Sequence, residues 1–265
     1  MNIIIFSKNR PAQLELLLRS MKKYFKEYDQ ETVKVLYKYD WEYKKGYKKV
    51  YQLYPKTYFI EETIDFKHHL LDLIDKKEKY TLFFCDDDVF IRPFSIQNKQ
   101  FKQLRINPDI LNINLRMSQN YNYCWDCDGY MAIPEFIDDM WQWRDYTIDW
   151  GFAMGCVGFV YRTSQIKELL KTLKFNGPNM MEAGLASHPL QQPLMVGYKK
   201  ARTVNIPLNL VQDVALQNRH INLSTENLNK QFMQGKIISL NNILRQTHNF
   251  NSCFMPIKPK WVKGE

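Results

Sequence analysis

The stretch YTLFFCDDD, residues 80–88, is the most informative part of the chain. Its first six residues form a short apolar run of the kind that becomes a buried β-strand. Three aspartates follow directly: Asp86, Asp87 and Asp88. A buried strand with such an ending places carboxylates at the carboxyl edge of a sheet, where open α/β folds bind ligands. Carboxylates there are typical ligands of a divalent cation that also binds phosphate.

The residues before this run alternate between predicted strands and helices. Strands are expected at residues 2–6, 32–37 and 58–60, and helices at 11–28, 40–49 and 66–74. Pro11 suits the first turn of a helix, and Asp65 can cap the helix that follows it. This β-α-β-α-β-α-β order predicts an α/β fold with a mostly parallel central sheet flanked by helices.

The second half of the chain has a less regular pattern. Residues 117–150 are rich in Trp, Tyr and Asp and are expected to form a long loop region with short helices. Ser164 is expected to cap a helix that runs to Leu173. No internal repeat or low-complexity linker is visible, so residues 1–265 are predicted to form a single domain. Further elements are expected as strands at 109–115, 157–161 and 204–206 and as helices at 180–186 and 223–232.

Positive charge is concentrated near the C-terminus. Residues 195–265 carry 10 basic and 3 acidic side chains, within a formal net charge of +9 for the whole chain. The bias indicates either a solvated basic surface or attraction to polyanions such as nucleotide phosphates or lipid headgroups. Nucleic acid ranks last as a partner because no nucleic-acid motif accompanies the charge. The basic segment at 258–263 would suit an anionic membrane surface, or it is a frayed tail.

Cysteine usage and the N-terminus favour a cytoplasmic protein, with peripheral membrane contact as an addition. The five cysteines include one CxxC pair, Cys124 and Cys127, without a second pair at the spacing of a zinc site. Reduced thiols in a reducing compartment are the expected state. The first residues lack a charged n-region and a cleavage site, and no run approaches the ~18 apolar residues of a membrane span.

The motif SKNRP at 7–11, the alternating first half and the aspartates at 86–88 together resemble nucleotide-sugar glycosyltransferases of the GT-A fold, of the family-2-like bacterial and viral type. Looser matches are DWGF at 149–152 and PNMME at 178–182. The resemblance implies a metal-dependent enzyme of polysaccharide biosynthesis. It would move a sugar from a nucleotide diphosphate sugar, with a UDP-sugar favoured, to a glycan or lipid-linked acceptor. Residues 1–92 would bind the nucleotide sugar and residues 93–265 the acceptor.

The resemblance also implies a Mn²⁺ or Mg²⁺ ion. Asp88 would bind it directly, whereas Asp86 would contact the ribose, or the metal through water. Asp86 and Asp88 would lie on the same side if the segment stays extended, because side chains alternate along a strand. Asp87 would be an orienting neighbour. His248 is the predicted third ligand, and His220 is its competitor.

The same resemblance suggests nucleotide contacts along the first half of the chain. The segment from Ser7 to Arg10 would line the base and ribose, with Arg10 meeting a phosphate or the base edge; alternatively Arg10 is a surface residue at a helix start. Beyond the second strand, either Tyr39 stacks on the base or Asp40 binds it. Two further residues, Asp65 and Lys67, lie at the start of the next helix and are also expected to contact the nucleobase.

An inverting transferase needs a carboxylate that takes the proton of the acceptor hydroxyl. Glu182 is the predicted base, and Asp149 beside Trp150 is the runner-up. Glu182 could instead be a first-turn acid that complements the helix dipole. Acceptor-side contacts are suggested for Arg116 and for Trp125 and Trp150, which could equally be core residues.

Two other functions compete with sugar transfer. A nucleotidyltransferase or another phosphoryl-transfer enzyme also places aspartates at a sheet edge, but that class usually has a glycine-rich phosphate loop. The segment from Ser7 to Pro11 contains no glycine. The third possibility is a non-catalytic nucleotide-sugar-binding protein. Three adjacent aspartates together with a candidate base argue against it.

Overall fold

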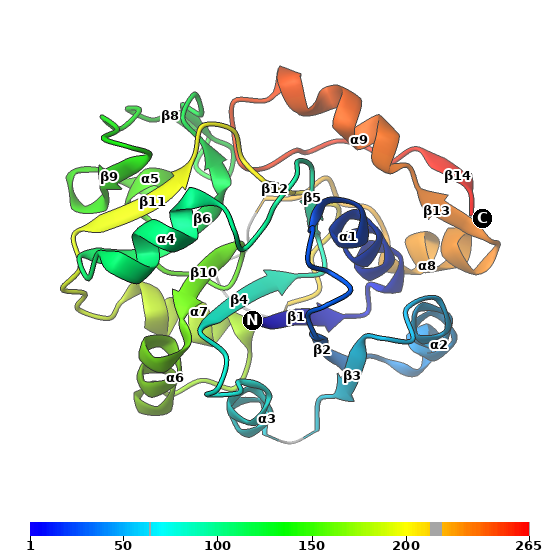
Figure 1. The fold of residues 1–265 in the computed structure, drawn as a ribbon. Coiled ribbons are helices and arrows are strands. Elements are labelled where there is room, and N and C mark those ends of the chain that lie inside the picture. The colour runs from blue at the N-terminus through cyan, green and yellow to red at the C-terminus, as the bar shows by residue number, and fades with distance from the viewer. Residues whose placement is uncertain (64, 213–218, 265) are drawn as a thin grey trace.

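The computed structural model describes residues 1–63, 65–212 and 219–264. Within them, the largest sheet has eight strands in the order β3-β2-β1-β4-β10-β6-β11-β9 (Figure 1). The strands that share one direction are β1 (Asn2–Lys8), β2 (Val33–Lys38), β3 (Tyr58–Glu61), β4 (Tyr80–Cys85), β6 (Ile110–Ser118) and β11 (Leu194–Tyr198). Running against them are β10 (Phe159–Arg162) and β9 (Met140–Gln142). The predicted α/β class with a mostly parallel central sheet is confirmed.

Helices cover both faces of this sheet because its central strands are apolar on both faces. Along β1, Ile3 and Ile5 belong to one core cluster, while Ile4 and Phe6 belong to another on the opposite side. The first cluster includes residues of α1 (Pro11–Tyr24), α2 (Lys44–Leu53) and α4 (Lys99–Ile106). The second includes residues of α3 (Phe66–Leu73), α6 (Thr163–Thr172) and α7 (Pro178–Ala186).

The first half of the chain follows the predicted order, with differences at the element ends. The first helix was expected to reach residue 28, but α1 ends at Tyr24 and Phe25 adopts an extended conformation. Phe25 forms a β-bridge with Phe94, and this tertiary contact outweighs the local helix pattern. A 3₁₀ turn, η1 (Trp41–Tyr43), precedes α2 in the region predicted as one short helix.

The Trp-rich region is ordered by burial rather than by regular structure. Trp141 and Trp150 are fully buried and pack edge to face with ring centroids 5.3 Å apart. Ser164 does not cap α6, because the helix already begins at Thr163 and Arg162 is the cap residue. The short elements of residues 117–151 are β7 (Tyr123–Cys124), β8 (Gly129–Tyr130), β9, η2 (Trp143–Asp145) and α5 (Ile148–Gly151).

The C-terminal quarter folds back over the first helix. β12 (Thr203–Asn205) pairs with β5 (Asp88–Phe90), which begins at the third aspartate. β14 (Trp261–Lys263) pairs with β13 (Lys236–Ile238), so this part of the basic segment is a strand and not a frayed tail. The remaining elements are α8 (Thr225–Met233), α9 (Leu240–Gln246) and η3 (Thr247–Asn249). No helix among the described residues is long and apolar enough to span a bilayer.

The central packing can be tested at Phe83, which is fully buried on β4. Phe83→Ala should lower the free energy of unfolding by about 3–5 kcal/mol, because it removes a large ring and leaves a cavity. Urea denaturation of both proteins measures the difference. Ile106→Ala, at an exposed position at the end of α4, is the control and should cost no more than about 0.5 kcal/mol. Equal losses for the two variants would contradict this description of the core.

Candidate functional site

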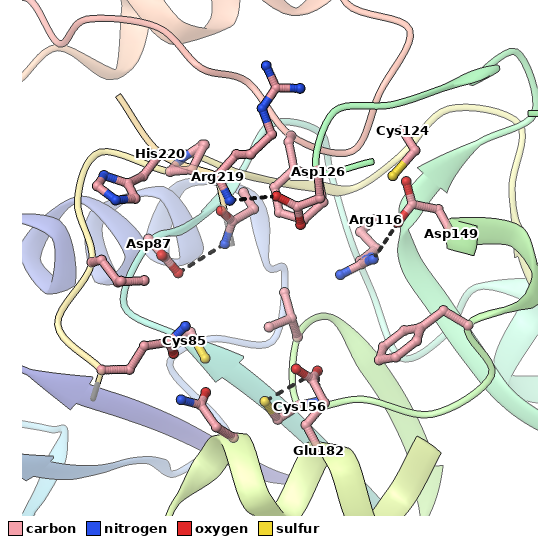
Figure 2. A pocket seen from close by; sticks show the side chains of 18 of the residues that line it. Cys85, Asp87, Arg116, Cys124, Asp126, Asp149, Cys156, Glu182, Arg219 and His220 are labelled. Atoms are coloured by element: carbon pink, nitrogen blue, oxygen red, sulfur yellow. Dashed lines mark hydrogen bonds and ion pairs between the residues drawn. The ribbon is translucent and has the colours of Figure 1, made fainter. Parts of the chain in front are cut away.

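Two adjoining cavities lie at the carboxyl ends of β1, β2 and β4. The Glu182 cavity, of about 340 Å³, is shown in Figure 2. The Ser7 cavity, of about 400 Å³, is bounded by the ends of β1 and β2 and by the starts of α3 and α7. The residues that line both are Arg10, Cys85, Asn179 and Gln212. The position agrees with the predicted ligand site at the carboxyl edge of the sheet.

Arg10 joins three segments at the junction of these cavities. Its Nη1 donates to Asp86 Oδ1 and to Asp87 Oδ2, both at 3.0 Å, and its Nε donates to Asn209 Oδ1 at 2.7 Å. Its Nη2 donates to the Asn209 carbonyl. Burial by itself lowers the pKa of Arg10, but Asp86 and Asp87 raise it above its ordinary value. Arg10 is therefore a buried cation between two strand ends, not a surface residue at a helix start.

The three aspartates occupy three different environments. Residues 86 and 87 form a turn, so the segment is not extended and the expected side-chain alternation does not apply. Asp87 lines the Glu182 cavity, Asp86 lines the Ser7 cavity, and Asp88 lines neither. Asp88 is enclosed, and its carboxylate accepts from the Cys85 N–H at 3.0 Å and from Asn205 Nδ2 at 3.2 Å. The structure thus brings Asp87, rather than Asp88, to the Glu182 cavity.

Burial changes the acidity of the two enclosed carboxyls. It raises the pKa of Asp86 to about 6, although Arg10 acts in the opposite direction. Burial also raises the pKa of Asp88 well above its usual value, and neighbouring Asp87 adds to this effect. Both shifts follow from removing a charged group from water.

Glu182 lies across the cavity from Asp87, on α7 (Figure 2). Its Oε1 accepts from the backbone N–H of Cys156 at 3.0 Å and from the Cys156 thiol at 3.5 Å. A Cβ on Gly155 would lie 2.6 Å from this oxygen, so the close approach requires glycine there. Glu182 is thus anchored by a neighbouring loop through one oxygen.

Asp149 and Arg116 form a buried ion pair in the same cavity. Arg116 Nη2 lies 3.2 Å from Asp149 Oδ1, and each side chain is 9% exposed. Arg116 projects from β6, and Asp149 belongs to α5. Trp150 is a fully buried core residue, whereas Trp125 packs on Phe254 and under Arg219.

Of the residues predicted to contact the base and ribose, some line a cavity and others do not. Ser7 lines the Ser7 cavity and shares a hydrogen bond of 2.7 Å with Tyr47. Tyr39 and Asp40 line neither cavity, and Asp40 instead exchanges hydrogen bonds with Asn9 in the loop before α1.

The two residues at the start of α3 are also engaged in structural contacts. Asp65 caps α3 by accepting from the His68 N–H at 2.9 Å. Lys67 donates to the carbonyls of Lys171 and Leu173 at the end of α6. Neither of them lines the two cavities, and Phe66 between them lines the Ser7 cavity.

The competing histidines are separated by the fold. His220 lines the Glu182 cavity, and its Nδ1 accepts from the Asn222 N–H at 3.1 Å. His248 is exposed in η3 and lines neither cavity. A metal role for His248 therefore has no support from its position.

The donor set near Asp87 fits a cation that the substrate helps to bind. Across residues 1–63, 65–212 and 219–264, no three His, Cys, Asp or Glu side chains group as a metal site. Asp87 Oδ1 accepts from Asn205 at 2.9 Å and Oδ2 accepts from Arg10, yet each carboxylate oxygen has a second lone pair. Mg²⁺ is commonly bound by one or two carboxylates together with substrate phosphates and waters. An all-protein cage does not fit here, but that arrangement does.

Sequence reasoning missed several lining residues. Lys38 and Glu62, 3.7 Å apart, line the Ser7 cavity at the ends of β2 and β3. The rule that parallel strands share a carboxyl edge could have found them. Asp126 accepts from the backbone N–H of Arg219 at 3.0 Å, and both residues line the Glu182 cavity. No local pattern joins two residues so far apart in the chain.

The role of Arg10 can be tested by stability. Arg10→Met should lower the free energy of unfolding by about 3–5 kcal/mol, because it leaves Asp86 buried without its cation. Guanidinium chloride denaturation measures the difference. Lys22→Met, at an exposed position on the helix that follows Arg10, serves as the control. A loss as small as that of the control would show that the ion pair does not hold the strand ends together.

Comparisons with known proteins identify one relevant relative. No family model matches the chain. The bifunctional glycosyltransferase pgtA of Dictyostelium discoideum is 28% identical over 190 residues, which cover 63% of this chain and 24% of that protein. The chain thus spans about a quarter of the length of this relative.

Three solved structures align with part of this chain at low similarity. S. aureus TarS 1-349 in complex with UDP-GlcNAc has 13% identity, covers 77% of this chain and 58% of that chain, and has a TM-score of 0.43. A cytidylyltransferase from Leptospira borgpetersenii has 12% identity, 68% and 67% coverage, and a TM-score of 0.39. Mouse xyloside xylosyltransferase 1 has 9% identity, 69% and 73% coverage, and a TM-score of 0.35. At such scores none of them bears on function. The sequence match confirms the predicted resemblance: this chain is similar to a glycosyltransferase.

Proposed function

We propose that this chain transfers a sugar from a nucleotide diphosphate sugar, with a UDP-sugar favoured, to a glycan or lipid-linked acceptor. The observation that carries the proposal is that Asp87 and Glu182 face each other across one cavity. This cavity adjoins a second one at the carboxyl ends of β1 and β2. Sequence similarity to a glycosyltransferase supports the same reaction class.

The two cavities suit the two ends of such a donor. The Ser7 cavity combines apolar side chains of Phe6, Leu36 and Phe66 with the polar Lys38 and Glu62, which suits a nucleobase with its apolar faces and polar edges. The Glu182 cavity would then hold the sugar and the attacking hydroxyl. Arg10, which lines both cavities, lies where the diphosphate would join the two parts.

A Mn²⁺ or Mg²⁺ ion bound by Asp87 and the donor phosphates would stabilise negative charge on the leaving diphosphate. In this proposal Asp87 binds the metal ion directly, whereas the sequence analysis expected Asp88 to do so. Arg10 and Asn205 fix the Asp87 carboxylate from two sides, so its orientation does not depend on the ligand. Asp88 holds the turn through Cys85 and Asn205.

Glu182 is the proposed base of an inverting reaction. Cys156 anchors its Oε1, while Oε2 has no hydrogen bond to any part of the chain that the structure describes. Oε2 can therefore accept the proton of an acceptor hydroxyl as that oxygen attacks the sugar. Asp149 is the weaker candidate, because its Oδ1 is committed to Arg116.

The metal role is testable by nucleotide binding. Asp87→Asn should weaken Mn²⁺-dependent binding of UDP by at least about tenfold, because the variant loses the cavity-facing carboxylate. Calorimetric titration of UDP, GDP, CDP and dTDP with and without Mn²⁺ measures this effect and identifies the preferred nucleobase. Asp109→Asn, at an exposed site, is the control.

The outcomes separate the two aspartates. If Asp88→Asn loses the Mn²⁺-dependent binding of nucleotide and Asp87→Asn keeps it, then Asp88 is the residue that binds the metal ion directly. If no nucleotide binds the unaltered protein with or without Mn²⁺, the proposed function is contradicted.

The base is testable by turnover. Glu182→Gln should lower kcat by about 10²–10⁴ while donor affinity stays unchanged, because the amide cannot take a proton. Single-turnover assays with the nucleotide sugar chosen by the binding panel measure both quantities. Glu168→Gln on the exposed face of α6 is a matched control. Unaltered turnover of Glu182→Gln would assign the base elsewhere.

A further inference from the structure

The Arg116–Asp149 pair lies in the Glu182 cavity but has no part in the proposed chemistry. Both residues are more than nine-tenths buried and both line the cavity. In Figure 2 the Arg116 guanidinium points into the space between Asp87 and Glu182, while Asp149 holds it from the opposite side. Its position is fixed further by aromatic rings, with the guanidinium carbon 5.6–5.9 Å from the ring centroids of Phe152, Phe159 and Phe254.

Both members of the pair keep unused hydrogen-bonding capacity. Arg116 Nε and Asp149 Oδ2 are shielded from solvent and have no hydrogen-bond partner among the described residues. Arg116 Nη1 likewise makes no hydrogen bond to the described part of the chain. Nε and Oδ2 have almost no accessible surface, so a ligand in the cavity reaches the pair through the end of the guanidinium group that points into it. A hydroxyl group is a suitable partner for this guanidinium because it accepts a hydrogen bond without adding charge.

The charge balance of the cavity disfavours an additional negative group. Its described lining includes the cations Arg10, Arg116 and Arg219 and the acids Asp87, Asp126, Asp149 and Glu182. Arg116 is already compensated by Asp149, and Arg10 by two aspartates. In the proposed complex the metal cation is balanced by Asp87 and the donor diphosphate. A carboxylate on the sugar would then meet Asp126 and Glu182, with Arg219 as the remaining described cation of the lining, and like charges brought together reduce affinity.

The same wall offers apolar surface to a ring. Phe152 and Phe254 line the cavity beside Arg116, and Ile148 completes this side. A pyranose has hydroxyls at its edge and C–H groups on its faces, so it matches a charged pair flanked by aromatic rings.

From these contacts we propose that the Arg116–Asp149 pair determines sugar specificity in the Glu182 cavity and selects a neutral pyranose over a hexuronate. The inference rests on the proposed function. The ring in question belongs either to the donor sugar or to the acceptor, because both present the same hydroxyl chemistry.

Asp149→Asn tests this inference, since the amide keeps the shape but removes the charge that compensates Arg116. Calorimetry with Mn²⁺ compares UDP, UDP-glucose and UDP-glucuronate for the donor. Methyl glucoside and methyl glucuronide, added in the presence of saturating nucleotide, report on the acceptor. The unaltered protein should favour the neutral ligand by at least about tenfold in one of the two arms. In Asp149→Asn the preference in that arm should fall at least about tenfold, because the freed Arg116 can pair with the uronate carboxylate.

Two further proteins complete the design. Asp145→Asn, an exposed acid shortly before α5, should keep the preference of the unaltered protein. Phe152→Leu should weaken the neutral and the acidic ligand alike, because it removes only the ring face. Thermal melting of every variant confirms that it is folded.

The outcomes are distinct. An unaltered preference in Asp149→Asn, a preference of the unaltered protein for uronates, or equal binding of the neutral and acidic sugars overturns the inference while UDP binding upholds the proposed function. Absence of binding for all nucleotides contradicts the proposed function, and the inference that rests on it is overturned as well.

Discussion

The ion pair of Arg10 with Asp86 and Asp87 is the interaction on which the rest of the site depends. A buried arginine requires compensating charge, and two carboxylates at the end of β4 provide it. Because Arg10 immediately precedes α1, the contact fixes the start of that helix against the end of the neighbouring strand. Asn209, which accepts from the same guanidinium, brings the chain beyond β12 to the same point. One side chain thus sets the spacing of three segments around both cavities.

The opposite wall of the Glu182 cavity is held independently of that ion pair. Glu182 is positioned by the loop at Cys156, and the small size of Gly155 allows the approach. Arg116 and Asp149 come from β6 and α5 and are fixed by their own pairing and by surrounding rings. The proposed metal, proton-transfer and sugar-recognition groups therefore lie on separate segments: the turn after β4, α7, and β6 with α5. Such separation allows each group to be preorganised without the substrate.

Local pattern predicted the fold class because it depends on the order of elements. The apolar runs that became β1, β2 and β4 are short and bounded by breakers, and the helix between the first two has a clear apolar stripe. Residues 117–150 resisted prediction because their Trp and Tyr side chains are placed by long-range packing. β5, α4 and β11 were missed as well, and α9 shows no strong periodic signal. Strand pairing across more than a hundred residues, as between β5 and β12, leaves no local trace.

The sequence by itself determined that a mostly parallel sheet would present acidic side chains at its carboxyl edge, because strand periodicity and the position of 86–88 are local properties. It also placed Arg10 at the start of a helix near that edge, whereas Glu182, expected in a first turn, lies in the second turn of α7. Only the tertiary structure decided which aspartate faces the Glu182 cavity. A turn at 86 and 87, closed by Asp88 and by Asn205 of a distant strand, turns Asp87 toward the cavity and encloses Asp88. The physical reason is that a buried carboxylate must accept hydrogen bonds from the donors that the fold places near it. Those donors come from segments far apart in the chain.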